Sequence, residues 1–63
     1  MNNDKLQGKW EQLKGNIQKK WGELTDDDLD VINGDSKILV GKLQEYYGMT
    51  KEEADTAIRE FEL

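Results

Sequence analysis

The chain has 63 residues, a net charge of -5 and neither cysteine nor histidine, and 35% of its residues are hydrophobic. A hydrophobic core of this size can stabilise only one small domain, so we expect a single domain over residues 1–63. The composition excludes disulfides and the usual ligand sets for structural zinc, and the negative charge argues against general binding to polyanions.

The sequence has no feature of a membrane or secreted protein. No apolar run approaches the ~20 residues of a membrane span. The first residues, MNNDKLQGKW, lack the basic and then apolar layout of a signal peptide. With cysteine absent as well, we expect an unprocessed cytoplasmic protein that does not bind membranes.

The first predicted helix is basic and amphipathic. Its apolar residues recur at steps of three or four and so share one stripe that faces a core: Leu6, Trp10, Leu13, Ile17, Trp21 and Leu24. Residues 1–22 carry five lysines against two acidic residues, a net charge of +3, whereas residues 23–63 carry four basic and twelve acidic residues, a net charge of -8. We expect the basic helix to lie against acidic neighbours in the same molecule; a docking patch for nucleic acid or another subunit is the alternative.

Three further helices are predicted, and no window alternates as a strand does, so the fold is predicted to be all-α. Their apolar positions, in chain order, are Leu29, Val31 and Ile32, then Ile38, Leu39, Leu43, Tyr46 and Tyr47, then Ala54, Ala57, Ile58 and Phe61. The residues expected to form most of the core are Trp10, Leu13, Ile17, Trp21, Leu43, Ile58 and Phe61.

Two of these helices start with capping signals. Thr25 can cap the helix that follows it, with Asp28 at the third helical position, and Thr50 and Glu53 repeat this arrangement. The acidic run Asp26-Asp27-Asp28 is then explained by the positive end of the helix dipole, so it requires no metal.

Six glycines form two sets with a common offset of 26 residues: Gly8, Gly15 and Gly22, then Gly34, Gly41 and Gly48. Their neighbours match too, so we predict an internal duplication in which each half is a long helix, a glycine stop, a threonine start and a shorter helix. We expect the glycines that follow helices, at positions 22, 34 and 48, to adopt positive φ.

Gly15 and Gly41 lie inside predicted helices, where each costs about 1 kcal/mol relative to alanine. We prefer to interpret them as tolerated weaknesses inherited from a duplicated ancestor. The alternative is a notch where another helix or a second molecule approaches closely.

Signatures of an enzyme are missing. Without histidine or cysteine the common arrangements of base and nucleophile cannot be built, so we expect no catalytic residue, no cofactor and no metal. A calcium loop fails too: with Gly34 at its sixth position, Leu29 and Val31 would fall at ligand positions.

The remaining candidates are interaction residues: Gly15, Gly41, Lys9, Lys20 and Tyr46. Lys9 and Lys20 lie on the same side of the first predicted helix, but Lys14 lies on another side. A groove that concentrates lysines around a phosphate is therefore not expected. Tyr46 and Tyr47 are adjacent and cannot both point inward, so one of them can mark a surface site.

The run GKWEQLKGNIQKKWGELTDDDL, followed by INGDSKILVGKLQEYYG, resembles the CsbD-like proteins, small bacterial proteins associated with general stress responses. The resemblance spans Gly8 to Gly48. It implies a four-helix domain of two helical hairpins packed crosswise, as in SAM-like folds, and no catalytic residues. Many relatives are poor in aromatic residues, and the aromatic residues of this chain favour a folded domain.

We therefore expect a non-enzymatic general stress response protein that acts as a small interaction or accessory module. Its partner would be a protein, and the chain itself would be a monomer or associate weakly with itself. The alternatives are nucleic-acid binding through the basic first helix, and a hydrophilic protectant during osmotic or water stress.

Overall fold

The computed structural model describes the backbone of residues 4–62 and the side chains of residues 6–61, so residues 1–3 and 63 of the expected domain lie outside the described residues. Within the described backbone the all-α prediction is confirmed. The helices are α1 (Asp4–Gly8), α2 (Trp10–Lys20), α3 (Asp26–Ile32), α4 (Ser36–Tyr47) and α5 (Lys51–Glu62), with no strand among them. No helix in this part of the chain is long and apolar enough to cross a membrane.

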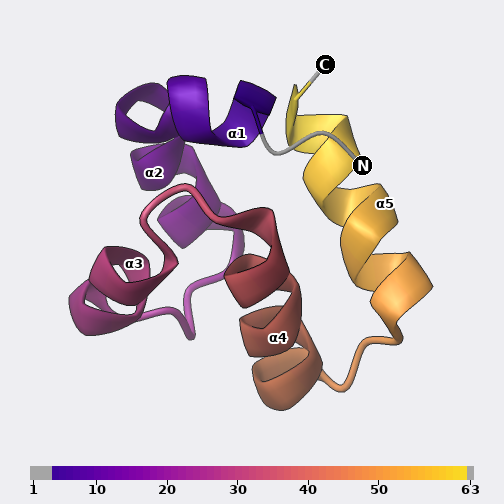
Figure 1. The fold of residues 1–63 in the computed structure, drawn as a ribbon. Coiled ribbons are helices and arrows are strands. Elements are labelled where there is room, and N and C mark those ends of the chain that lie inside the picture. Colours follow the sequence, from indigo (N-terminus) through magenta and orange to yellow (C-terminus); the bar gives the residue numbers. More distant parts are fainter. Residues whose placement is uncertain (1–3, 63) are drawn as a thin grey trace.

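Helix α4 is central to the arrangement. It contacts α3 and α5, which lie on either side of it in Figure 1. Helix α1 and the first turns of α2 lie above α3 and α4 in this view. Helices α1 and α2 contact each other. All five helices contribute side chains to one core. Short connections between neighbouring helices are the usual arrangement in small helical domains.

The first predicted helix is divided. Lys9, with φ -113° and ψ 15°, interrupts the backbone between α1 and α2, and α2 ends at Lys20, before Trp21 and Leu24. The described residues thus form five helices, where the periodicity predicted four. Gly8 weakens the helix immediately before the bend, and Leu6 of α1 is fully buried in the core.

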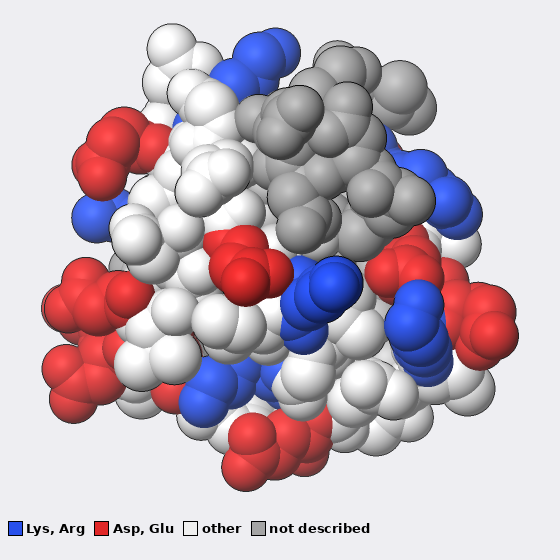
Figure 2. All heavy atoms as spheres, in the orientation of Figure 1, with Lys and Arg blue, Asp and Glu red and all other residues white. Residues whose placement is uncertain are grey.

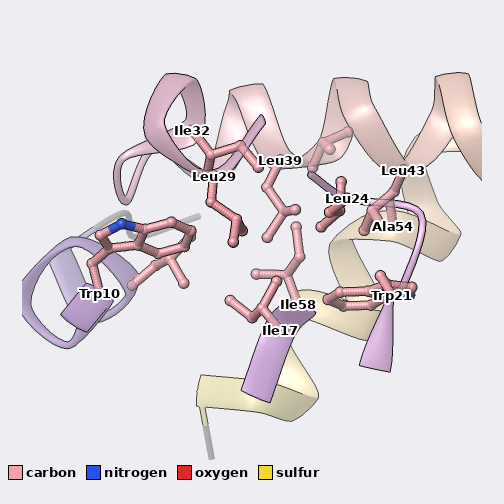
Figure 3. Packing of buried hydrophobic residues seen from close by; sticks show 12 residues of the cluster. Trp10, Ile17, Trp21, Leu24, Leu29, Ile32, Leu39, Leu43, Ala54 and Ile58 are labelled. Carbon is pink, nitrogen blue, oxygen red and sulfur yellow. The ribbon is translucent and has the colours of Figure 1, made fainter. Parts of the chain in front are cut away.

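One hydrophobic cluster joins all five helices and the connection after α2. Its buried members are Leu6, Trp10, Ile17, Trp21, Leu24, Leu29, Ile32, Leu39, Val40, Leu43, Ala54 and Ile58, and partly buried Leu13, Ile38, Met49, Ala57 and Phe61 pack against it. Figure 3 shows the two indoles at opposite ends of the cluster, with Ile17 and Ile58 between them. The indole of Trp21 also packs against the ring of Phe61, with centroids 5.3 Å apart.

Left-handed residues end two helices. Asn33 (φ 42°) and Gly34 (φ 85°) follow α3, and Gly48 (φ 66°) follows α4. The expectation of positive φ is wrong for Gly22, because α2 ends through Trp21 at φ -115° and Gly22 follows without a left-handed conformation. The turn after α2 therefore does not require a glycine.

Candidate functional site

Asp28 is the centre of a polar cluster between α3 and α4. Its Oδ2 accepts hydrogen bonds from the backbone N–H of Thr25 (3.0 Å) and from the hydroxyl of Tyr46 (2.8 Å), and its Oδ1 lies 3.3 Å from Nζ of Lys42. The Oγ1 of Thr25 accepts in return from the backbone N–H of Asp28 at 3.1 Å, which completes a capping box. Asp28 is only 8% exposed, so the cluster fixes the start of α3 against the end of α4.

These contacts shift two pKa values in opposite directions. The hydrogen bond from the backbone of Thr25, and then that from Tyr46, lower the pKa of Asp28 from 3.8 to about 2. The pKa of Tyr46 is raised above its usual 10.0, first because its hydroxyl donates to the carboxylate of Asp28. At neutral pH the pair therefore keeps one protonation state, a charged carboxylate and a neutral phenol, which suits a structural contact better than proton transfer.

A second set of contacts holds the connection after α2. The backbone N–H of Glu23 donates to the hydroxyl of Tyr47 at 3.0 Å. Nε2 of Gln18 donates to the carbonyl of Leu24 at 3.2 Å and to Oδ1 of Asp26 at 3.1 Å. The side chain of Gln18 thus extends from α2 across the connection to the start of α3.

Sequence reasoning missed these contacts because their partners are distant in the chain. Tyr46 and Tyr47 reach residues 18 and 24 positions away, and no local pattern encodes such pairs. The two side chains are 36% and 38% exposed, so the structure does not single out Tyr46 as the surface tyrosine.

The start of α5 carries a second capping box. The carboxylate of Glu53 accepts from the backbone N–H of Thr50 at 2.9 Å, and Oγ1 of Thr50 accepts from the backbone N–H of Glu53 at 3.1 Å. Met49, the residue before Thr50, packs against the core. The side chains of Thr50 and Glu53 are therefore used to fix a helix end.

The five candidate interaction residues do not converge on one site. Lys9 borders an open hollow of ≈ 350 Å³ at the α1–α2 bend, and Lys20 borders another of ≈ 260 Å³ beside α5. Gly15 and Gly41 are exposed inside α2 and α4, where a Cβ added to either would meet nothing within 4 Å. The hydroxyl of Tyr46 is occupied by the Asp28 cluster.

The basic helix α2 makes no ion pair with another element among the side chains that the structure describes. Lys14 pairs with Glu11 of its own helix at 3.8 Å, and Nζ of Lys20 lies 5.7 Å from the centroid of the Trp21 ring. The expected packing against acidic neighbours therefore does not appear as ion pairs in this range. Figure 2 shows acidic and basic side chains interspersed on one face rather than separated into two fields.

Among the described residues, no three potential metal ligands are grouped as a metal site requires. The acidic run at the start of α3 instead divides its side chains: Asp28 faces the core side, and Asp26 and Asp27 are exposed. This arrangement agrees with an N-terminal charge effect on the helix.

Residues 4–56 match the sequence model of the CsbD-like family. The chain belongs to the CsbD-like family. It is 54% identical to a UPF0337 protein of Pseudomonas aeruginosa over 97% of this chain and 94% of the relative. A UPF0337 protein of Xanthomonas axonopodis pv. citri is 55% identical (98% and 90% of the two chains), and one of Bordetella pertussis is 52% identical (97% and 92%).

No solved structure matches the chain. The CsbD-like match includes the Asp28 cluster and both capping boxes, because all of their residues lie between positions 4 and 56. These contacts are therefore part of the region that defines the family in this chain.

Proposed function

We propose that the chain is a non-enzymatic accessory protein of the general stress response, and that it works by binding a protein partner through the outward faces of its helices. One observation carries the proposal. Polar side chains that are fixed in place, among them those of Asp28, Thr25, Tyr46 and Tyr47, are used in contacts that hold helices and connections together. The outward faces of α2 and α4 instead carry open glycines, which suits binding rather than chemistry.

The family supports further parts of the proposal. We infer that the domain is a duplicated pair of helical hairpins packed crosswise in a SAM-like manner, with the division of the first helix as a local departure. The lack of cysteine supports a cytoplasmic location.

The test is complementation of a bacterial strain that lacks its CsbD-like protein, scored by survival of stress. The double variant Gly15→Gln, Gly41→Gln fills both outward faces without touching the core, since neither position has a neighbour within 4 Å. We expect it to fold at least as stably as the natural protein and to fail in complementation. Gly22→Gln is the matched control, because Gly22 is equally open but lies outside the helices, and it should complement fully.

Complementation by the double variant at the natural level would contradict the proposal. It would mean that neither outward face is used, whatever other surface the protein presents. Circular dichroism and thermal melting of each variant establish that any failure comes from a folded protein.

Nucleic-acid binding through α2 is the second candidate. It is favoured by Lys9 and Lys19, which are exposed and make no ion pair among the described side chains. We expect no measurable association with DNA or RNA even at low salt, because Lys9 and Lys20 border different hollows and the chain carries a charge of -5. Binding that weakens steeply with added salt would support this candidate instead.

A protectant role remains the third candidate. It follows from the high content of charged residues, 37% of the chain, rather than from any site. We expect the protein to protect a client enzyme during drying or osmotic stress no better than an unrelated acidic protein of the same size.

A further inference from the structure

The outward faces of α2 and α4 carry opposite charge patterns around an open glycine. On each helix three residues spaced four apart form a row along one face, because four residues are slightly more than one helical turn. The α2 row reads acidic, glycine, basic, and the α4 row reads basic, glycine, acidic. The rows are Glu11, Gly15 and Lys19 on α2, and Lys37, Gly41 and Glu45 on α4.

All six residues of the two rows are exposed. Glu11 makes an ion pair within its own helix, at 3.8 Å to Lys14, and is 85% exposed in doing so. The charged groups of Lys19, Lys37 and Glu45 make no ion pair with another described side chain. The charges of both rows are therefore accessible to a second molecule.

The two rows cannot meet within one chain. Ile17 lies two residues after Gly15, and Leu43 two residues after Gly41, which places each on nearly the opposite side of its helix. Both Ile17 and Leu43 are fully buried in the shared core. The α2 row and the α4 row therefore both point away from the core, and neither faces the helix that carries the other row.

We propose that the α2 row of one copy binds the α4 row of a second copy, with the helices parallel and Gly15 against Gly41. In this orientation Glu11 meets Lys37 and Lys19 meets Glu45, because every residue meets the one 26 positions further along the sequence. An antiparallel contact would place Glu11 against Glu45 and Lys19 against Lys37, so like charges exclude it.

The glycines determine how closely the copies approach. A Cβ at Gly15 or Gly41 would stand in open space, so neither glycine is needed for packing inside the monomer. Facing each other between two helices, they let the backbones come close and bring the flanking ion pairs together. Contact between two copies thus explains the interior glycines of both helices, which packing within the monomer does not.

The contact is weak. Each row spans nine residues, and its two ends lie about 12 Å apart along the helix, so the buried area is far below the ~800 Å² per partner of a stable complex. The ion pairs are exposed, so salt screens them. Each copy also keeps one unused row, and association therefore extends to short chains of molecules unless a ring closes.

This inference rests on the proposed function in using the same outward faces, and it names a second copy as their occupant. Sedimentation equilibrium of the purified full chain tests it without a cellular partner. We expect the average mass to rise above that of the 7.3 kDa monomer with concentration at low salt, and to rise less at high salt. A monomer at every concentration in low salt overturns the inference.

Charge reversal tests the pairing. Lys19→Glu and Glu45→Lys should each weaken association roughly fivefold or more, and the double variant should recover most of the loss because the pair is restored with reversed signs. Arg59→Glu and Glu60→Lys change the net charge equally but lie on α5, outside both rows, and should leave association within about twofold. A double variant that stays as weak as the single ones, or controls that weaken association equally, overturns the pairing.

A steric pair completes the test. Gly15→Gln should abolish the rise in mass, whereas Gly22→Gln should not. If the natural protein is monomeric yet the Gly15→Gln, Gly41→Gln variant still fails in complementation, the inference fails and the proposed function stands. If the protein associates as expected and that variant complements fully, the proposed function fails and the self-contact stands.

Discussion

At the residue scale, Gly34 and Gly48 share a left-handed backbone conformation but differ in the space around them. Both have positive φ, at 85° and 66°. A Cβ at Gly34 would lie 3.0 Å from the Cα of Gln7 and 3.4 Å from the Cβ of Trp10, whereas one at Gly48 would meet nothing within 4 Å. Gly34 thus combines a left-handed turn with close packing of the α3–α4 turn against α1.

We expect Gly34→Ala to destabilise the protein more than Gly48→Ala does. The left-handed strain alone costs about 1–2 kcal/mol for alanine, and this is the loss expected at Gly48. At Gly34 the contact with backbone adds a further ~1–3 kcal/mol, because an atom of Gln7 cannot rotate away. Urea unfolding of both variants measures the difference, and equal losses would show that α1 moves aside freely.

Asp28 and Tyr46 make stability depend on pH at both extremes. Because the pKa of Asp28 falls from 3.8 to about 2 on folding, its contribution is present above pH 4 and is lost as the pH falls towards 2. The pKa of Tyr46 is raised on folding, so its contribution is present below pH 10 and is lost as the pH rises through the folded value.

Asp28→Asn should remove the acid contribution and reduce the alkaline one, because burial and the charges of Glu45 and Glu23 also raise the pKa of Tyr46. The free energy of unfolding of the variant should be lower at neutral pH, and it should fall less between pH 4 and pH 2 and less above pH 10 than that of the natural protein. Tyr46→Phe should remove the alkaline slope and leave part of the acid slope, since Thr25 still donates to the carboxylate. Urea unfolding at a series of pH values measures both, and an unchanged acid slope in Asp28→Asn would contradict the assignment.

At the scale of the elements, α2 and α4 are helices weakened in the middle. Gly15 and Gly41 have helical conformation and open surroundings, so a methyl group at either position gains helix propensity without a clash. Helices of 11 and 12 residues are marginal by themselves, and the buried faces around Ile17 and Leu43 must supply the rest of their stability.

We expect Gly15→Ala and Gly41→Ala each to raise the free energy of unfolding by about 1 kcal/mol, and the two gains to add because the residues share no contact. Thermal melting followed by circular dichroism measures the effect. Gly22→Ala is the comparison, since it is equally open but outside the helices and should change the midpoint little. A loss of stability at either helical position would mean that its methyl group meets an obstacle that the structure does not have.

At the scale of the whole molecule, a single core joins every described helix. The radius of gyration is 10.3 Å, against about 10.6 Å expected for a compact chain of this length. The core includes Trp10 at one end and Trp21 at the other (Figure 3). Since neither end has a core of its own, the helices should unfold together.

The two indoles provide the measurement. In Trp10→Phe the remaining fluorescence reports on the end near α5, and in Trp21→Phe it reports on the end near α1. We expect fluorescence and circular dichroism to give the same midpoint within each variant, although the two variants differ in stability. Separate midpoints would indicate that the α1–α2 region and α5 unfold independently.

The sequence by itself determined the features that depend on near neighbours. The all-α class follows from the spacing of apolar residues. The Thr25–Asp28 and Thr50–Glu53 pairs can be recognised in the sequence because a capping box needs only residues three positions apart. The ends of helices were the least reliable part of the prediction. The bend at Lys9 and the absence of a positive φ at Gly22 depend on how α1 and Trp21 reach the core.

Only the tertiary structure decided which distant side chains meet. The contacts of Asp28 with Tyr46 and Lys42, of Tyr47 with Glu23, and of Gly34 with α1 all join residues that are far apart in the sequence. The periodicity of one helix fixes which face is buried, but not which part of another helix that face meets, because many packings bury the same apolar area. The folded chain selects one of them, and in doing so it leaves the glycine rows of α2 and α4 facing outward.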